Sequence, residues 1–333
     1  MPVLVVAAAT VKRMQYRLAY AEGTRVECHG DDSKSSFVFT IWRTPLISTA
    51  AHTMASPVTA TYAPGYNTTT HHEFRTAHNS AAYLLFTLEK LCATTANPTM
   101  LDVGCGSGTI TASFAQLFPT LRITAVDLSP EILARAKEHA ETIGVADIVT
   151  FRPANVYDLT ATIGTGTQFD VVHAHQMLVH LSEPVKAMQQ LLSVAKPGGW
   201  LACRDICMRT FSFYPDTAIM QSWLRLQIAT HDAAGGSSNA GAPLGAWAVQ
   251  AGASREKVKL GMGSWMYASP QERQVWGGTF RDRIRSGAMR SKALELRIAS
   301  DEEMEQMAIE WERWIENENG CCGSLHGELL VQV

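Results

Sequence analysis

Three glycines, Gly104, Gly106 and Gly108, stand at alternate positions where an apolar run gives way to apolar residues at helical spacing. This pattern predicts a strand, a tight turn and a helix. Glycine allows backbone dihedrals and ligand distances that a Cβ would forbid, and the start of a helix offers free N–H groups to a polar ligand. The stretch is therefore predicted to be a cofactor-binding turn.

The spacing of the glycines decides between ligands. A dinucleotide-binding G-x-G-x-x-G would need glycine where Thr109 stands, and a P-loop would need a lysine that does not follow. Instead, Asp102 opens an acidic-x-Gly-x-Gly-x-Gly pattern. A second apolar run, Leu121 to Val126, ends at Asp127, where a carboxylate can accept hydrogen bonds from both ribose hydroxyls. A solvated loop acid is the alternative interpretation of Asp127.

Three further strands are predicted downstream, each next to polar or turn residues. They are Val149–Arg152 before Asn155 and Val156, Phe169–His173 before Ala174 and His175, and Trp200–Cys203 after Lys196-Pro-Gly-Gly. Strands that alternate with helical patterns in this way indicate an open, mostly parallel α/β sheet.

These ordered segments resemble the motifs of the class I S-adenosylmethionine (SAM) methyltransferases. In that family the glycine turn wraps the amino-acid end of the cofactor, and Asn155 stands where an aspartate usually binds the adenine amino group. An amide oxygen can accept the same hydrogen bond. The resemblance implies SAM as the cofactor, bound by Asp102, Gly104, Cys105, Gly106, Gly108, Asp127, Leu128, Asn155, Val156 and Ala174.

The resemblance also implies a fold. The expected architecture is an α/β, Rossmann-like sheet of seven strands in the order 3-2-1-4-5-7-6, with a sixth strand at Lys257 to Tyr267 and an antiparallel last strand at Glu328 to Val333. Helical insertions at about 208–256 and 269–318 are expected to form a cap. They would lie over the site because ligands of open α/β sheets bind beyond the carboxyl ends of the strands.

A narrower resemblance runs from Arg75 to Leu85, through Trp276-Gly-Gly, to the closing His326-Gly-Glu. These segments are similar to UbiE/COQ5-like methyltransferases, and in particular to fungal enzymes that S-methylate the thiols of epidithiodiketopiperazines such as gliotoxin. This resemblance implies a small-molecule acceptor, first a secondary-metabolite thiol. Hydroxyl, amine or carbon acceptors and a SAM-binding protein without transferase activity are the alternatives. Thr109 disfavours a nicotinamide dehydrogenase.

Methyl transfer from a sulfonium is an in-line displacement, which needs a positioned nucleophile and a site closed to water. A thiol ionises more readily than a phenol, so it needs less help from the protein. His175, just beyond the fourth predicted strand, is the candidate general base or orienter, and a cofactor-lining or helix-capping role is the alternative. The candidate substrate residues, for which packing is the alternative, are Tyr66, Trp265, Trp276 and Arg281.

Composition limits the partners and the compartment. The chain has 333 residues and a formal net charge of −3, without the basic excess that nucleic-acid binding usually needs. No apolar stretch approaches the roughly 18 residues of a membrane span. The 7 cysteines include no C-x-x-C, which suits a reducing cytosol, so a cytoplasmic protein is expected. Adjacent Cys321 and Cys322 are expected to be small hydrophobes, and no metal site is predicted.

Residues 1–53 differ from the rest of the chain. An apolar stretch near the start lacks a basic region before it, which argues against a signal peptide, and acidic residues dilute the basic ones that hint at a transit peptide. We expect an extension of poor order at 1–53 and a methyltransferase domain at 54–333. The functional polypeptide is predicted to start near Met54. The sequence leaves the oligomeric state open.

Overall fold

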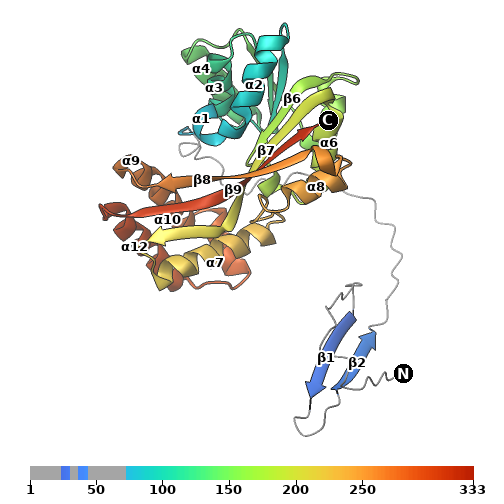
Figure 1. Cartoon of the computed structure of the whole chain (residues 1–333). Helices are drawn as coiled ribbons and strands as arrows, with labels where there is room; N and C mark the ends of the chain where they lie inside the picture. The colour runs from blue at the N-terminus through green and yellow to red at the C-terminus, as the bar shows by residue number, and fades with distance from the viewer. Residues whose placement is uncertain (1–23, 31–36, 44–72) are drawn as a thin grey trace. The chain divides into compact units, whose positions relative to one another are not determined.

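A computed structural model of the chain describes residues 24–30, 37–43 and 73–333 (Figure 1). The chain divides into two compact units, Met1–Pro57 and Val58–Val333. In the first unit, β1 (Thr24–Gly30) and β2 (Phe37–Arg43) pair in antiparallel register. Apart from these two strands, the expectation of poor order at 1–53 lies outside the described residues, as does the predicted start near Met54.

The second unit contains a sheet of seven strands in the order β5-β4-β3-β6-β7-β9-β8. The strand β9 is antiparallel to both of its neighbours, and the other five strands from β5 to β7 pair in parallel. This arrangement confirms the predicted order 3-2-1-4-5-7-6. The strands are β3 (Thr99–Val103), β4 (Arg122–Asp127), β5 (Val149–Pro153), β6 (Phe169–His175), β7 (Ala195–Tyr214), β8 (Val258–Tyr267) and β9 (Cys321–Gln332).

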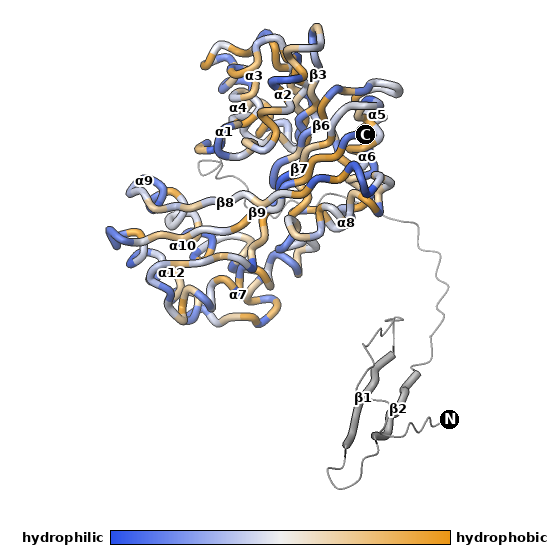
Figure 2. The backbone as a smooth tube through the Cα atoms, viewed as in Figure 1, coloured by the Kyte–Doolittle hydropathy of each residue, from blue (hydrophilic) through white to orange (hydrophobic). Residues whose placement is uncertain are grey.

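Helices cover both faces of this sheet because its side chains alternate between two cores. In β3, for example, Met100 joins one core, whereas Leu101 and Val103 join the other. The hydrophobic stretches of the central strands are visible in Figure 2. The first core packs on α1 (Ala77–Ser80), α2 (Ala82–Thr94), α3 (Thr109–Leu117) and α4 (Pro130–Thr142), and the second on α5 (Leu159–Ile163), α6 (Pro184–Ser193) and α8 (Leu244–Gln250).

The strands β7, β8 and β9 continue past the parallel part of the sheet and carry a helical lobe (Figure 1). The lobe has a third core, in which the rings of Trp223 and Trp311 lie 4.7 Å apart. Residues 208–214, which were expected in the helical cap, extend β7 instead, because Phe211 and Phe213 pack on this core. The helices of the lobe are α7 (Ala218–Ala233), α9 (Pro270–Glu272), α10 (Gly278–Arg285), α11 (Ala288–Glu295) and α12 (Asp301–Glu316), with a π-helical turn at Arg273–Gly277.

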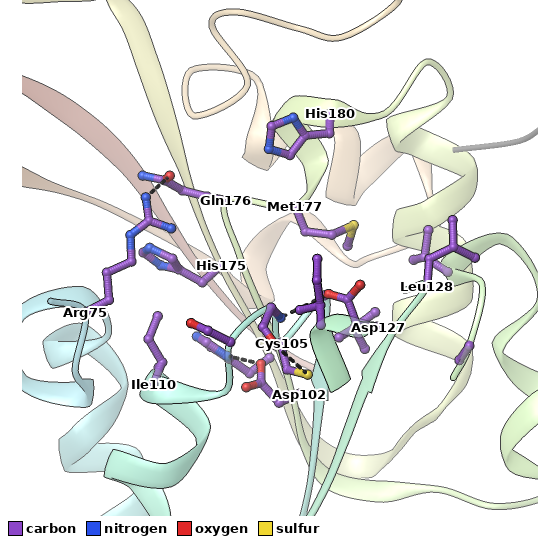
Figure 3. Close-up of a pocket in the computed structure, with 18 of the residues that line it drawn as sticks. Arg75, Asp102, Cys105, Ile110, Asp127, Leu128, His175, Gln176, Met177 and His180 are labelled. Atoms are coloured by element: carbon purple, nitrogen blue, oxygen red, sulfur yellow. Dashed lines mark hydrogen bonds and ion pairs between the residues drawn. The ribbon is translucent and has the colours of Figure 1, made fainter. Parts of the chain in front are cut away.

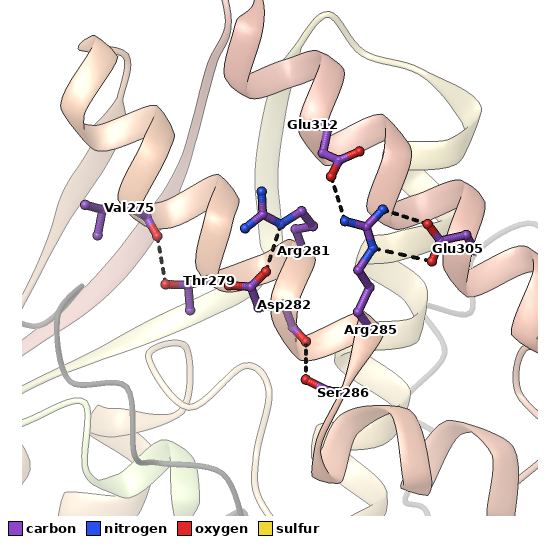
Figure 4. Close-up of polar contacts among 8 residues, drawn as sticks. All are labelled: Val275, Thr279, Arg281, Asp282, Arg285, Ser286, Glu305 and Glu312. Carbon is purple, nitrogen blue, oxygen red and sulfur yellow. Dashed lines mark hydrogen bonds and ion pairs between the residues drawn. The ribbon is translucent and has the colours of Figure 1, made fainter.

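Polar contacts join α10 to α12 on the surface of the lobe (Figure 4). Arg285 pairs with Glu305 and with Glu312, each at 2.6 Å. Arg281, a predicted substrate residue, pairs with its neighbour Asp282 at 2.8 Å. Because these groups are partly or fully exposed, solvent screens the pairs and they contribute little to stability, so the aromatic core carries most of the stability of the lobe.

Candidate functional site

The predicted turn after β3 has the backbone that its glycines allow. Gly104, Gly106 and Gly108 have φ angles of 72°, 54° and 74°, in the left-handed region that side chains rarely adopt. The amides of Gly104 and Cys105 both donate to the carbonyl of Val126 at the end of β4, over 2.8 and 3.1 Å. The turn is thereby tied to the neighbouring strand, and α3 begins directly after Gly108.

The three glycines have different surroundings. A Cβ on Gly106 would meet nothing within 4 Å, whereas one on Gly108 would lie 2.8 Å from Ala136 Cβ in α4. A Cβ on Gly104 would lie 2.7 Å from the side chain of Met177. Gly104 and Gly106 line a pocket, while Gly108 does not; it allows α3 to pack closely on α4. The third glycine of the motif is therefore structural.

A pocket opens beyond the carboxyl ends of β3, β4 and β6, where open α/β sheets bind ligands (Figure 3). The empty space within it, including its open mouth, is about 1000 Å³. Ala174, a predicted cofactor residue, is fully buried in β6 and does not line it. The predicted residues that line it are Asp102, Gly104, Cys105, Gly106, Asp127, Leu128, Asn155, Val156 and His175.

Asp127 is buried in this pocket, with 3% of its surface exposed, and is not a solvated loop acid. Its Oδ2 accepts a hydrogen bond from the amide of Gly106 at 3.0 Å, and its Oδ1 accepts one from the amide of Ser129 at 3.2 Å. Ser129 also caps α4, with Pro130 at its first position, as the sequence predicts. The carboxylate is thus held in place where two ribose hydroxyls would have to donate.

Asp102 and Asn155 are engaged by their own chain. Asp102 accepts a hydrogen bond from Thr111 Oγ1 at 2.5 Å and lies 2.8 Å from His173 Nδ1, so it ties β3 to α3 and β6. The side-chain oxygen of Asn155, the predicted acceptor for adenine, already accepts from the amide of Tyr157 at 3.0 Å. That oxygen has a second lone pair, so it can hold a ligand donor in addition.

His175, the predicted base or orienter, ends β6 inside the pocket with 7% of its surface exposed. Neither of its ring nitrogens has a hydrogen-bond partner among the described residues. Burial, with the cations Arg75 and Arg204 nearby, lowers the pKa of His175 well below its usual range. The imidazole is therefore neutral at pH 7, with one nitrogen able to accept a proton and the other able to donate a hydrogen bond.

The lining residues that the sequence interpretation did not single out as functional include Arg75, Gln176, Met177 and His180. Gln176 and Met177 follow His175 directly, so their position at the end of a parallel strand could have indicated them. Arg75 lies 101 residues before Gln176, to which it donates a hydrogen bond of 2.5 Å. No local pattern predicts that contact.

The three candidate substrate residues that the structure describes do not line this pocket. Tyr66 lies outside the described residues. Trp265 and Trp276 are buried in the core of the lobe, each stacked on Tyr267 with ring centroids 5.6 and 4.3 Å away. These contacts correspond to the packing alternative, because the aromatic lobe needs large side chains at its base. Arg281 lies on α10 in its ion pair.

Within residues 24–30, 37–43 and 73–333, no helix has the length and hydrophobicity that a membrane span requires. The same residues contain no group of three or more histidine, cysteine or acidic side chains that could hold a metal ion.

Comparisons with known proteins agree with this geometry. A family model described as a methyltransferase domain matches residues 94–250. An uncharacterized methyltransferase of Schizosaccharomyces pombe is 30% identical over 271 residues, which cover 78% of this chain and 91% of the relative. The probable methyltransferase ltbC of Aspergillus luteorubrus is 28% identical over 82% of this chain and 97% of its own length. A ubiquinone biosynthesis O-methyltransferase of Xanthomonas axonopodis is 38% identical over 31% of this chain and 40% of its own.

The sheet order and the glycine turn beside the buried carboxylate of Asp127 are those of a class I methyltransferase. The chain belongs to the SAM-dependent methyltransferase family. Its residues fit SAM: Gly106, whose Cβ position is open, forms the floor of the pocket, and Asp127 stands at the end of β4. Neither ring nitrogen of the buried His175 has a hydrogen-bond partner among the described residues. The narrower resemblance to thiol methyltransferases concerns the methyl acceptor, which the cofactor-binding residues do not identify.

Proposed function

We propose that this enzyme methylates the sulfur of a small secondary-metabolite thiol. The observation that supports the proposal is the buried, neutral His175 at the pocket wall. Bound SAM supplies the methyl group on its sulfonium. Moving a proton from a thiol to an imidazole with a pKa below 6.5 is uphill by more than about 3 kcal/mol, and from a phenol by more than about 5 kcal/mol. A weak base favours an acceptor that ionises readily.

The charges around the pocket support the same acceptor class. Arg75 lines the pocket, and the guanidinium of Arg204 lies behind it, held by the carbonyls of Asn79 and Ser80 at 3.0 Å each. Glu328 lies 3.4 Å from Arg204 and offsets part of its charge. Cations near the acceptor stabilise a thiolate nucleophile and disfavour the positive charge that develops on an amine nitrogen as it takes up the methyl group. An N-methyltransferase would benefit from the opposite charge.

O-methylation of a phenol is the second candidate. It is favoured by the relative whose name is ubiquinone biosynthesis O-methyltransferase, which matches 31% of this chain. A phenolate would also be stabilised by Arg75. Transfer to nitrogen or carbon, and SAM binding without transfer, are the remaining outcomes of the test.

We further propose that the enzyme acts in the cytoplasm. The six cysteines within residues 73–333 are all free, as expected in a reducing compartment. A reduced dithiol would also persist there as a substrate.

The test uses acceptors that differ in one atom. The enzyme is incubated with isotopically labelled SAM and matched 4-substituted thiophenol, phenol and aniline, together with a reduced dithiol, and products are followed by mass. We expect S-methyl product with the largest kcat/KM. A larger kcat/KM for the phenol would contradict the proposal and select the second candidate. Tight SAM binding without product from any acceptor would indicate the non-transferase alternative.

A His175→Ala variant tests the role of the base. With the reduced dithiol, an alkyl thiol, as acceptor, we expect turnover at pH 7 to fall more than the affinity for SAM. At pH 9 most of an ordinary thiol is already ionised, so most of the lost turnover should return. A loss that is equal at both pH values would mean that His175 orients the ligands rather than accepting a proton.

A further inference from the structure

A chain of side-chain hydrogen bonds runs from the pocket into β9. Arg75 Nη2 donates to Gln176 Oε1 at 2.5 Å, as Figure 3 shows. Gln176 Nε2 lies 3.1 Å from His326 Nδ1. His326 Nε2 in turn lies 3.3 Å from Ser324 Oγ. Since Arg75 and Gln176 line the pocket while His326 is fully buried, the path joins the pocket wall to the interior.

The chemistry of the four groups fixes the direction of each bond. A guanidinium only donates, so the oxygen of Gln176 must face Arg75 and its NH₂ must face His326. Nδ1 of His326 must then accept, which leaves the proton on Nε2 to be donated to Ser324. A protonated imidazole would set two donors against each other. Burial, with Arg204 and Arg75 nearby, lowers the pKa of His326 to about 2, consistent with a neutral ring.

The backbone at Gln176 is unusual for a residue with a side chain. Its φ is 49°, in the left-handed region, which costs on the order of 1 kcal/mol. Its amide donates to the carbonyl of Arg204 in β7 at 2.7 Å, which holds this conformation. A glycine would adopt it without strain. The backbone conformation therefore does not explain why residue 176 is a glutamine. The hydrogen bonds of its side chain do.

This chain of hydrogen bonds lies apart from the end of the pocket where we expect the ribose. Figure 3 shows Arg75 and Gln176 on one side, and Asp127 and Leu128 on the other. Its far end belongs to the strand extension, because Ser324 pairs with Trp265 of β8 at the base of the lobe. The fixed cation thus stands between the cofactor floor and the lobe, where an acceptor would enter.

We propose that Gln176, His326 and Ser324 are positioning residues, which aim the guanidinium of Arg75 at the anionic sulfur or oxygen of the methyl acceptor. The proposal rests on the proposed function for the class of acceptor. The guanidinium of Arg75 is held in one orientation, because each group in the hydrogen-bond chain has only one allowed orientation. A guanidinium held in this way strengthens a charge-assisted hydrogen bond without having to be ordered when the acceptor binds.

The hydrogen-bond chain is tested without activity by NMR of ¹⁵N-histidine-labelled protein, with His326 assigned from a His326→Asn variant. We expect the wild-type ring to be neutral with its proton on Nε2. In Gln176→Glu the carboxylate still accepts from Arg75 but has no proton for Nδ1, so the ring proton should move to Nδ1. An unchanged tautomer in Gln176→Glu would overturn the chain, whatever the acceptor proves to be.

The function is tested with Gln176→Gly, which removes the side chain and relieves the backbone. We expect a modestly lower melting temperature, because relief of the backbone offsets only part of the loss of the two hydrogen bonds, and an unchanged dissociation constant for S-adenosylhomocysteine. With the acceptor that the matched panel identifies, kcat/KM should fall about 10- to 100-fold. Ser324→Ala, which removes only the last acceptor of the chain, should lower kcat/KM by less.

Two results would overturn the assignment to the acceptor. One is a wild-type kcat/KM in Gln176→Gly. The other is a loss of affinity for S-adenosylhomocysteine as large as the loss in kcat/KM, since it would show that Arg75 serves the cofactor. Failure of the proposed function looks different: the wild-type enzyme would methylate another atom, while the ring tautomer would still respond to Gln176→Glu.

Discussion

Substituting Gly108 by alanine should damage the fold more than the cofactor site. Gly108 precedes α3 with a φ of 74°, a conformation that costs an alanine about 1 kcal/mol. The new Cβ would also lie 2.8 Å from Ala136 Cβ and 3.3 Å from its Cα, so α3 and α4 must move apart. Overpacking of this kind typically costs about 1–3 kcal/mol. The free energy of unfolding should therefore fall by roughly 2–4 kcal/mol.

The assay is thermal unfolding with and without S-adenosylhomocysteine, beside isothermal titration of the same ligand. For a unit of this size the loss corresponds to a melting temperature lower by about 5–12 °C. Gly106→Ala is the matched control: its backbone is equally left-handed, but a Cβ there meets nothing within 4 Å. Gly106→Ala should lower the melting temperature by only about 2–4 °C. It should weaken ligand binding more than Gly108→Ala does, because Gly106 lines the pocket. A melting temperature of Gly108→Ala within about 2 °C of the wild type would refute the reasoning, because backbone strain alone accounts for that much.

Two further changes test the site and the buried charges. Asp127→Ala should weaken SAM binding about 10- to 100-fold with a smaller effect on melting, because a carboxylate on ribose hydroxyls makes charge-assisted hydrogen bonds; unchanged affinity would remove the ribose assignment. Lowering the pH from 7 to 5 should lower the free energy of unfolding, measured in urea, by about 3 kcal/mol. Burial lowers the pKa of His180 to about 3, that of His326 to about 2 and that of His175 well below its usual range. As the pH falls below about 6.5, these three histidines therefore bind protons in the unfolded chain but not in the folded protein. Burial also raises the pKa of Asp205 to about 7, which opposes the effect with one proton against three; a stability that is flat or rises toward pH 5 would contradict this count.

The sequence alone predicted the parts of the protein that depend on short stretches. Alternate glycines between an apolar run and a helical pattern predicted the turn, and the structure gives all three a positive φ. Asp127 and His175 stand at the ends of apolar runs, and the ends of neighbouring parallel strands meet at one edge of a sheet, so both line the pocket. The strand order followed from family resemblance, and the pairing of β9 between β7 and β8 confirms it.

The tertiary structure decided which partners these residues have. Gly108 and Asp102 belong to the motif, yet one allows α3 to pack on α4 and the other holds Thr111 and His173. Residues 208–214 are strand rather than cap because aromatic side chains of β7 pack on helices that come later in the chain.

Arg75 and Ser324 illustrate the same limit most clearly. The hydrogen bonds that connect them join residues 101 and 150 positions apart, across Gln176 and His326. Residue type states what a side chain can donate or accept, but the partner depends on how β6 and β9 are placed in the sheet. The sequence by itself thus determined the cofactor turn and the chemistry available to each residue, whereas the folded sheet decided which groups meet at the acceptor side of the pocket.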